Sequence, residues 1–119
     1  MLAPLDIRFS QDSICKRFKE RRYTLSVNET LREIACNKLS SDVLLPIDVV
    51  SKSGQVYSLD NRRLYIFRVL QLIGKVNIID VRYVTYNPYI HQRKFTTDNN
   101  GLSVRVRGDI TYRHNLRTK

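Results

Sequence analysis

Four consecutive residues near the middle of the chain have the types and spacing for chemistry: Asp60, Asn61, Arg62 and Arg63. Apolar residues follow them at helical spacing, so we expect the four to form a helix start, with Asp60 as the N-cap. Unpaired backbone N–H groups make a helix start electropositive, and Arg62 and Arg63 add positive charge to it. Such a start is suited to binding phosphate. Alternatively, the arginines are solvated, or one of them pairs with Asp60 or another acid.

The segments that must position this helix start lie on either side of it. Residues 47–50 and 56–59 are rich in β-branched and aromatic side chains and are predicted strands. A tight turn joins them, in which Gly54 takes a positive φ. The helix is expected over 61–73, because Gly74 fits the position just past a helix end.

Further elements are predicted before and after this unit. Alternation of apolar and polar residues predicts a strand over 5–9, followed by a short helix that ends at about Phe18. The S-x-x-E pattern that begins at Ser26 is a capping box, and it predicts a helix over 27–39. Residues 76–86 are rich in Val, Ile and Tyr and form the longest predicted strand.

The last part of the chain is basic and is predicted to form a hairpin. The turn signal at 98–101 ends in Asn-Gly, and residues 94–97 and 102–107 would flank it as strands. Residues 108–119 are expected to be a frayed basic tail. Two arginines of the second strand would share one face, where they lie in solvent or meet an anion. The candidate contacts to nucleic acid are Arg93, Lys94, Arg105 and Arg107.

The central unit resembles the ParB/sulfiredoxin-like superfamily. The family's PI-x-V strand has its counterpart in Pro46-Ile47-Asp48-Val49, and a turn and a second strand follow. ParB-type domains then open a helix with a G-E-R-R box, whose counterpart here is D-N-R-R at 60–63. Asn61 stands where ParB-type domains have glutamate and where sulfiredoxins have their catalytic cysteine, so sulfiredoxin chemistry is not expected. The resemblance extends over about residues 5–84.

This resemblance implies an α+β fold with a small mixed sheet, packed helices and a C-terminal β-hairpin extension. Residues 1–90 would form the ParB/sulfiredoxin-like core, and 91–119 the basic extension and tail of the same single domain. The family also implies a nucleoside triphosphate with Mg²⁺ as cofactor, its phosphates placed against the helix start. Asp60 would then cap the helix or help to hold the metal, and Asn61 would hydrogen-bond the ligand.

The two arginines of the box are expected to have different roles, one in contacting phosphate and one in holding the box in shape. Consecutive helical residues are about 100° apart, so both side chains cannot point straight into one pocket. We predict that Arg62, which is nearer the helix start, contacts the ligand. Arg63 should be the more buried of the two and should pair with an acid or with backbone carbonyls.

The composition favours an anionic partner. The 119 residues carry a net charge of +10, which favours nucleic acid, a phosphorylated ligand or an acidic surface. The length fits one domain. No apolar run approaches the ~20 residues that span a membrane, and the N-terminus lacks a signal-peptide pattern. We therefore expect an intracellular protein without a membrane partner.

The cysteines do not indicate a metal site. Cys15 and Cys36 form no CxxC pair and no Cys/His cluster at metal-binding spacing. Both lie among apolar neighbours on predicted helices, and we expect buried free thiols.

The favoured function is a nucleotide- or phosphate-binding module that works with nucleic acid. One alternative is an enzyme on the same fold, a phosphotransferase or a nuclease. Asp60 is the only acid beside the arginines, and no catalytic residue is assigned. Another alternative is a basic nucleic-acid-binding protein without nucleotide chemistry. The sequence leaves the oligomeric state open.

Overall fold

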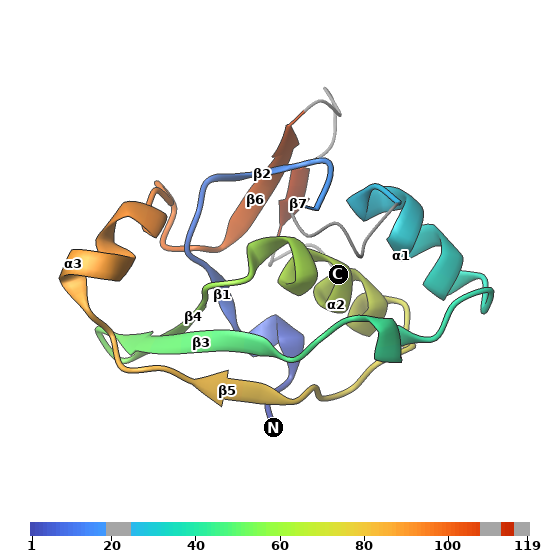
Figure 1. Ribbon diagram of the computed structural model, residues 1–119, viewed down its shortest axis with the longest axis horizontal. Coiled ribbons are helices and arrows are strands. Elements are labelled where there is room, and N and C mark those ends of the chain that lie inside the picture. The colour runs from blue at the N-terminus through green and yellow to red at the C-terminus, as the bar shows by residue number, and fades with distance from the viewer. Residues whose placement is uncertain (19–24, 108–112, 116–119) are drawn as a thin grey trace.

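The computed structural model describes residues 1–18, 25–107 and 113–115, which combine strands and helices as an α+β fold (Figure 1). This confirms the predicted α+β class with a mixed sheet and packed helices. The strands are β1 (Arg8–Phe9), β2 (Ser13–Cys15), β3 (Ile47–Lys52), β4 (Gln55–Ser58), β5 (Val81–Tyr83), β6 (Ser103–Arg107) and β7 (Arg113–Asn115). The α-helices are α1 (Val27–Ala35), α2 (Asn61–Leu72) and α3 (Pro88–His91). The 3₁₀ turns are η1 (Pro4–Asp6), η2 (Ser41–Val43) and η3 (Gln92–Lys94).

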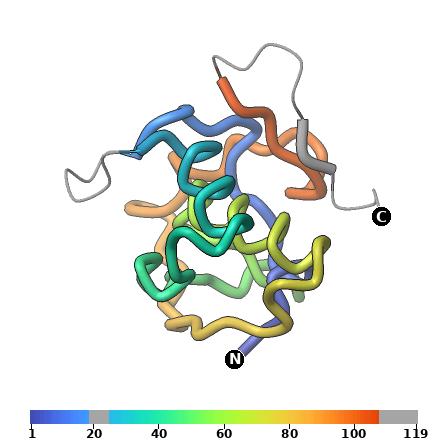
Figure 2. Tube along the Cα trace, turned by 90° about the vertical axis from the view of Figure 1, so that its right-hand side faces the viewer, coloured from blue at the N-terminus to red at the C-terminus, as the bar shows by residue number. Residues whose placement is uncertain are grey.

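The strands form a larger and a smaller mixed sheet. The larger has the order β1-β4-β3-β5, in which β3 and β4 are antiparallel and the other pairs parallel. The smaller has the order β2-β6-β7, with β2 parallel and β7 antiparallel to β6. In Figure 1, α2 lies between the two sheets, and Figure 2 shows α1 beside α2.

The central strand–turn–strand–helix unit forms as predicted. Gly54 and Gly74 both take positive φ, at the β3–β4 turn and just beyond α2. Apolar side chains cover more than one side of α2, which therefore packs against several elements. The predicted core residues that are buried are Ile34, Val49, Leu64, Phe67, Leu70 and Ile79; Leu31 and Val81 are partly buried and pack against them.

The capping box of α1 is also confirmed, but the helix ends before the predicted Leu39. The Ser26 hydroxyl accepts from the Glu29 N–H, and the Glu29 carboxylate accepts from the Ser26 N–H. The last helical residue is Ala35, because Asn37 takes a φ of 62° and turns the chain out of the helix.

The helix predicted to end near Phe18 is wrong, because Ser13–Cys15 forms β2. This strand pairs in parallel with β6 from the far end of the chain. The predicted strand over 5–9 is shorter than expected, since Pro4–Asp6 forms η1 before β1 begins at Arg8. Whether such a short segment forms a strand depends on a pairing partner that is remote in sequence. Local periodicity carries no information about that partner.

The strand predicted over 76–86 is limited to Val81–Tyr83. Just before it, Ile79 forms an isolated antiparallel bridge with Leu2, and β5 then pairs in parallel with β3. The segment thus changes its pairing partner, which interrupts the long predicted strand.

The hairpin predicted for 94–107 is wrong. Gln92–Lys94 forms η3, and β6 pairs with β2 and β7 rather than with residues 94–97. The antiparallel pair of this region is therefore β6 with β7. The frayed tail predicted from Gly108 lies partly outside the described residues, and its residues 113–115 form β7 instead.

The turn predicted at 98–101 forms and brings the C-terminal region against β1. Asn100 and Gly101 both have positive φ. The Gly101 carbonyl oxygen accepts from the Phe9 N–H at 3.0 Å. A Cβ atom at Gly101 would lie 2.3 Å from the Phe9 carbonyl oxygen, so this approach requires glycine. The C-terminal region is therefore packed into the fold.

One charged residue of α2 lies in the core. Arg68 is fully buried, and none of its guanidinium nitrogens has a hydrogen-bond partner in the structure. Its Cζ lies 4.6 Å from the centroid of the Phe9 ring, which is a cation–π contact. Burial lowers the pKa of Arg68 to about 10, so the guanidinium remains charged at neutral pH.

Within the described residues no helix has the length and apolar character to cross a membrane.

Candidate functional site

A cationic pocket opens at the first turn of α2. Its volume is about 430 Å³, and its lining comes from the start of α2, from β2 and its surroundings, and from η3 and β6. Among the described residues that line it, Asp60 supplies the one carboxylate, so their net charge is positive. The cationic side chains that line it are Arg62, Arg63, Arg93, Lys94 and Arg107.

The pocket joins both groups of residues that the sequence singled out. The D-N-R-R segment at 60–63 lines it together with Arg93, Lys94 and Arg107 of the C-terminal region. Arg105 does not line it, although it is exposed on β6 two positions before Arg107. The structure therefore separates Arg105 from the other candidates.

Asp60 is the N-cap residue of α2, but its side chain does not cap the helix. The carboxylate accepts from the Asp48 N–H at 2.7 Å and pairs with Arg63. The predicted capping bond is wrong because the carboxylate is directed to β3 and to the helix's own arginine. Within the described part of the chain no side chain therefore caps the first-turn N–H groups of α2, which keeps them available to an anion.

Arg63 has the partners that were predicted for it. Its Nη2 lies 2.8 Å from Oδ1 of Asp60, and its Nη1 donates to the Pro46 carbonyl oxygen at 3.2 Å. The side chain is 12% exposed. Arg63 therefore holds the start of α2 against the chain that enters β3.

Arg62 and Arg93 differ from Arg63 because neither side chain has a hydrogen bond or ion pair with any residue that the structure describes. Both line the pocket; Arg62 is partly buried and Arg93 is exposed. Their guanidinium donors are therefore uncommitted, which is what a phosphate ligand requires.

Two further cations of the pocket are partly committed. Lys94 Nζ donates to the Leu59 carbonyl oxygen at 3.1 Å, and Arg107 Nη2 lies 2.7 Å from the Cys15 sulfur. An ammonium has three donors and a guanidinium five, so each retains donors for a ligand.

Cys15 itself is only partly buried, on β2, and Cys36 is exposed, so the expectation of two buried thiols on helices is wrong.

Asn61 is buried and bonds within the protein. Its Oδ1 accepts from the Ser10 N–H at 2.9 Å, and its Nδ2 donates to the Ser10 hydroxyl at 2.9 Å. The Ser10 hydroxyl in turn donates to the Ser58 carbonyl oxygen. These hydrogen bonds hold the start of α2 against the segment between β1 and β2, so Asn61 has a positioning role.

Ser10 also fastens the C-terminal side of the pocket. Its carbonyl oxygen accepts from the Thr96 N–H at 2.9 Å, and the Thr96 hydroxyl donates to Asp12. Sequence reasoning missed Ser10 and Thr96. A lone serine or threonine has no spacing that marks it, because its partners lie 51 and 84 positions away.

The pocket suits the phosphates of the expected cofactor but not its metal. Arg62, Arg93 and the uncapped helix start provide free donors. Mg²⁺ would need oxygen ligands, and the Asp60 carboxylate already pairs with Arg63 and accepts from Asp48. Within the described residues no group of three or more His, Cys, Asp or Glu side chains is placed to hold a metal ion.

Comparison of the chain with models of known protein families, with curated proteins and with solved structures finds no match.

Proposed function

We propose that the protein binds a phosphorylated ligand, such as a nucleotide, in the cationic pocket at the start of α2. The observation that carries this proposal is the pair Arg62 and Arg93, which line one pocket and have no partner in the described chain. Cations gathered from two distant parts of the sequence repel one another unless an anion lies between them. A phosphate group would offset that repulsion.

The size of the pocket and the sequence resemblance support the same proposal. A volume of about 430 Å³ is within the range of small-molecule sites. In ParB-type domains the helix-opening box lines a nucleotide site, and its counterpart here, 60–63, lines this pocket. The ligand would place its phosphates against Arg62, Arg93 and the first turn of α2, and Arg63 would keep that turn in position.

Work with nucleic acid is the second part of the proposal. Arg105 and Arg107 are both exposed on β6, and Arg107 reaches the pocket. A phosphate backbone that passes the pocket would therefore meet Arg105 next. The same arrangement also fits a nucleic-acid-binding protein without nucleotide chemistry, which the experiment below distinguishes.

We do not extend the proposal to catalysis, because the carboxylate of Asp60, the acid among the described residues that line the pocket, already pairs with Arg63 and accepts from the Asp48 N–H.

Calorimetric titration with ATP, CTP and GTP tests the proposal. The double variant Arg62→Ala/Arg93→Ala should bind at least about tenfold more weakly than the wild type, because each charge-assisted hydrogen bond contributes about 1.5–3 kcal/mol. Arg32→Ala is the matched control, since Arg32 is exposed on α1 and does not line the pocket. Equal affinities for the wild type and the double variant would contradict the site. A parallel titration with duplex DNA separates the two candidate functions. Binding of DNA but of no nucleotide would favour a nucleic-acid-binding protein without nucleotide chemistry.

A further inference from the structure

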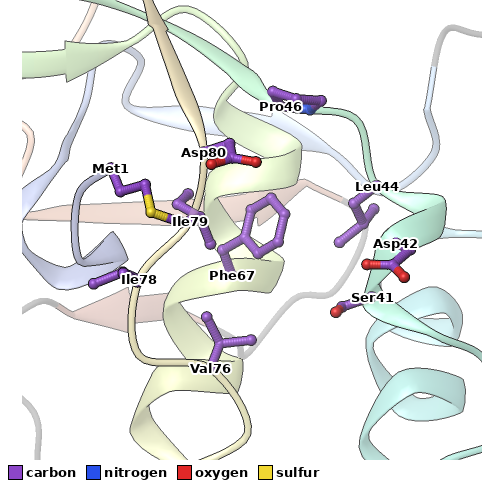
Figure 3. A pocket seen from close by; sticks show the side chains of 10 residues that line it. All are labelled: Met1, Ser41, Asp42, Leu44, Pro46, Phe67, Val76, Ile78, Ile79 and Asp80. Carbon is purple, nitrogen blue, oxygen red and sulfur yellow. The ribbon is translucent and has the colours of Figure 1, made fainter.

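A second cavity, which we call the apolar groove, shares no lining residue with the cationic pocket. Its volume is about 320 Å³. Figure 3 shows Phe67 of α2 in its middle, with Leu44 on one side and Ile78 and Ile79 on the other. The groove thus has an apolar floor between two separate segments of the chain.

Exposed apolar side chains continue the groove onto the surface. Ile78 lines it and is 53% exposed. Val43 and Leu45, on either side of Leu44 in the sequence, are also exposed. Exposed apolar side chains that adjoin a groove are typical of surfaces that bind another molecule.

The charge of the groove is opposite to that of the whole chain. Asp42 and Asp80 line it, and Figure 3 places them on either side of the Phe67 ring. Both are exposed, and neither has an ion pair within the described residues. No Lys or Arg is among the described residues that line the groove, although the chain carries a net charge of +10.

We propose that the apolar groove binds a peptide segment of a partner protein in which one large apolar side chain is flanked by lysine or arginine. The apolar side chain would cover Phe67, and the basic flanks would pair with Asp42 and Asp80. The net charge of +10 on the chain opposes binding of such a segment in general, whereas the two carboxylates at the groove attract it. This proposal is independent of the function proposed for the cationic pocket.

Titration of the ¹⁵N-labelled full chain with the peptide Ac-Arg-Arg-Leu-Arg-Arg-NH₂, followed by NMR, tests the groove. Amide shifts of residues 41–45 and 76–80 should move on binding, while those of residues 60–63 at the cationic pocket should not. The peptides with serine in place of leucine and with glutamate in place of arginine should give much smaller changes. Equal changes with the serine peptide, or no change in either groove segment, would overturn the proposal.

A charge variant adds a second readout. Asp42→Asn/Asp80→Asn should weaken binding of the arginine–leucine peptide about three- to tenfold, as expected for two exposed ion pairs. Asp98→Asn is the control, because Asp98 is exposed and does not line the groove. Equal weakening by the control would contradict a specific role for the two carboxylates. Self-association of the chain that buries residues 41–46 and 76–80 would also overturn the proposal, because a second copy would then occupy the groove.

Discussion

The first and third turns of α2 both carry arginine, but in different surroundings. At the first turn Arg63 pairs with Asp60, and Arg62 lines an open pocket. At the third turn Arg68 is fully buried, and its guanidinium has no hydrogen bond to any residue that the structure describes. Water or a ligand can reach the Arg62 guanidinium, whereas the buried Arg68 guanidinium is desolvated.

This difference teaches that the same residue type favours function at one turn and opposes stability at the other. The contact of Arg68 with the Phe9 ring offsets part of the desolvation, by up to about 2 kcal/mol. An uncompensated buried ion costs several kcal/mol, so a net penalty remains. A neutral substitution of Arg63 should therefore lower stability, whereas one of Arg68 should raise it.

The largest effect is expected at Phe67, next to Arg68 in the sequence. Phe67 is buried, so Phe67→Ala should lower the free energy of unfolding by about 3–5 kcal/mol. Denaturant unfolding followed by circular dichroism measures this change. A loss below about 1 kcal/mol would mean that α2 does not form the centre of the core.

Arg68→Met should raise the free energy of unfolding by about 1–4 kcal/mol, because it replaces a buried unpaired ion by an apolar side chain of similar length. The exposed Arg32 provides the control, and Arg32→Met should stay within about 0.5 kcal/mol of the wild type. A loss of about 3 kcal/mol or more at Arg68 would instead show that the guanidinium has a strong partner, and the contrast between the two turns would not hold.

Arg63→Ala should lower the free energy of unfolding by about 1–3 kcal/mol, because it leaves the Asp60 carboxylate and the Pro46 carbonyl without a partner. Arg62→Ala, at the neighbouring position, should change it by less than about 0.5 kcal/mol. Thermal unfolding of the two variants side by side provides the measurement. Equal losses in both would contradict the division of roles between them.

The smallest effect is expected at Arg105, which lies on β6 outside the pocket. Arg105→Ala should reduce the slope of log K against log salt for duplex DNA by about 1 and leave ATP affinity unchanged. Fluorescence anisotropy at several salt concentrations measures the slope. An unchanged slope would remove Arg105 from the nucleic-acid contacts.

The central unit was predictable because its signals are local. Gly54 and Gly74 mark the turn and the helix end, and both take the positive φ expected of them. The pairing of Arg63 with an acid or with backbone carbonyls was expected from helical geometry and from the resemblance of the box, and Asp60 and Pro46 are the partners. Each of these residue patterns lies within a few positions of the turn, helix end or ion pair that it predicts.

The closure of the pocket could not be predicted, since long-range contacts produce it. Asn61 bonds Ser10 across 51 positions, and Arg107 meets Cys15 across 92. The pairing of β2 with β6, which brings Arg107 there, overrides the local helical pattern that ends near Phe18. No spacing rule identifies such partners from a single sequence.

A crystal structure of the chain with ATP tests the account most directly. We predict a triphosphate within hydrogen-bond distance of Arg62 and Arg93, against the uncapped first turn of α2, with the Arg63–Asp60 pair intact. An ordered triphosphate elsewhere on the chain, or an empty pocket at ATP concentrations far above any Kd measured by calorimetry, would contradict it.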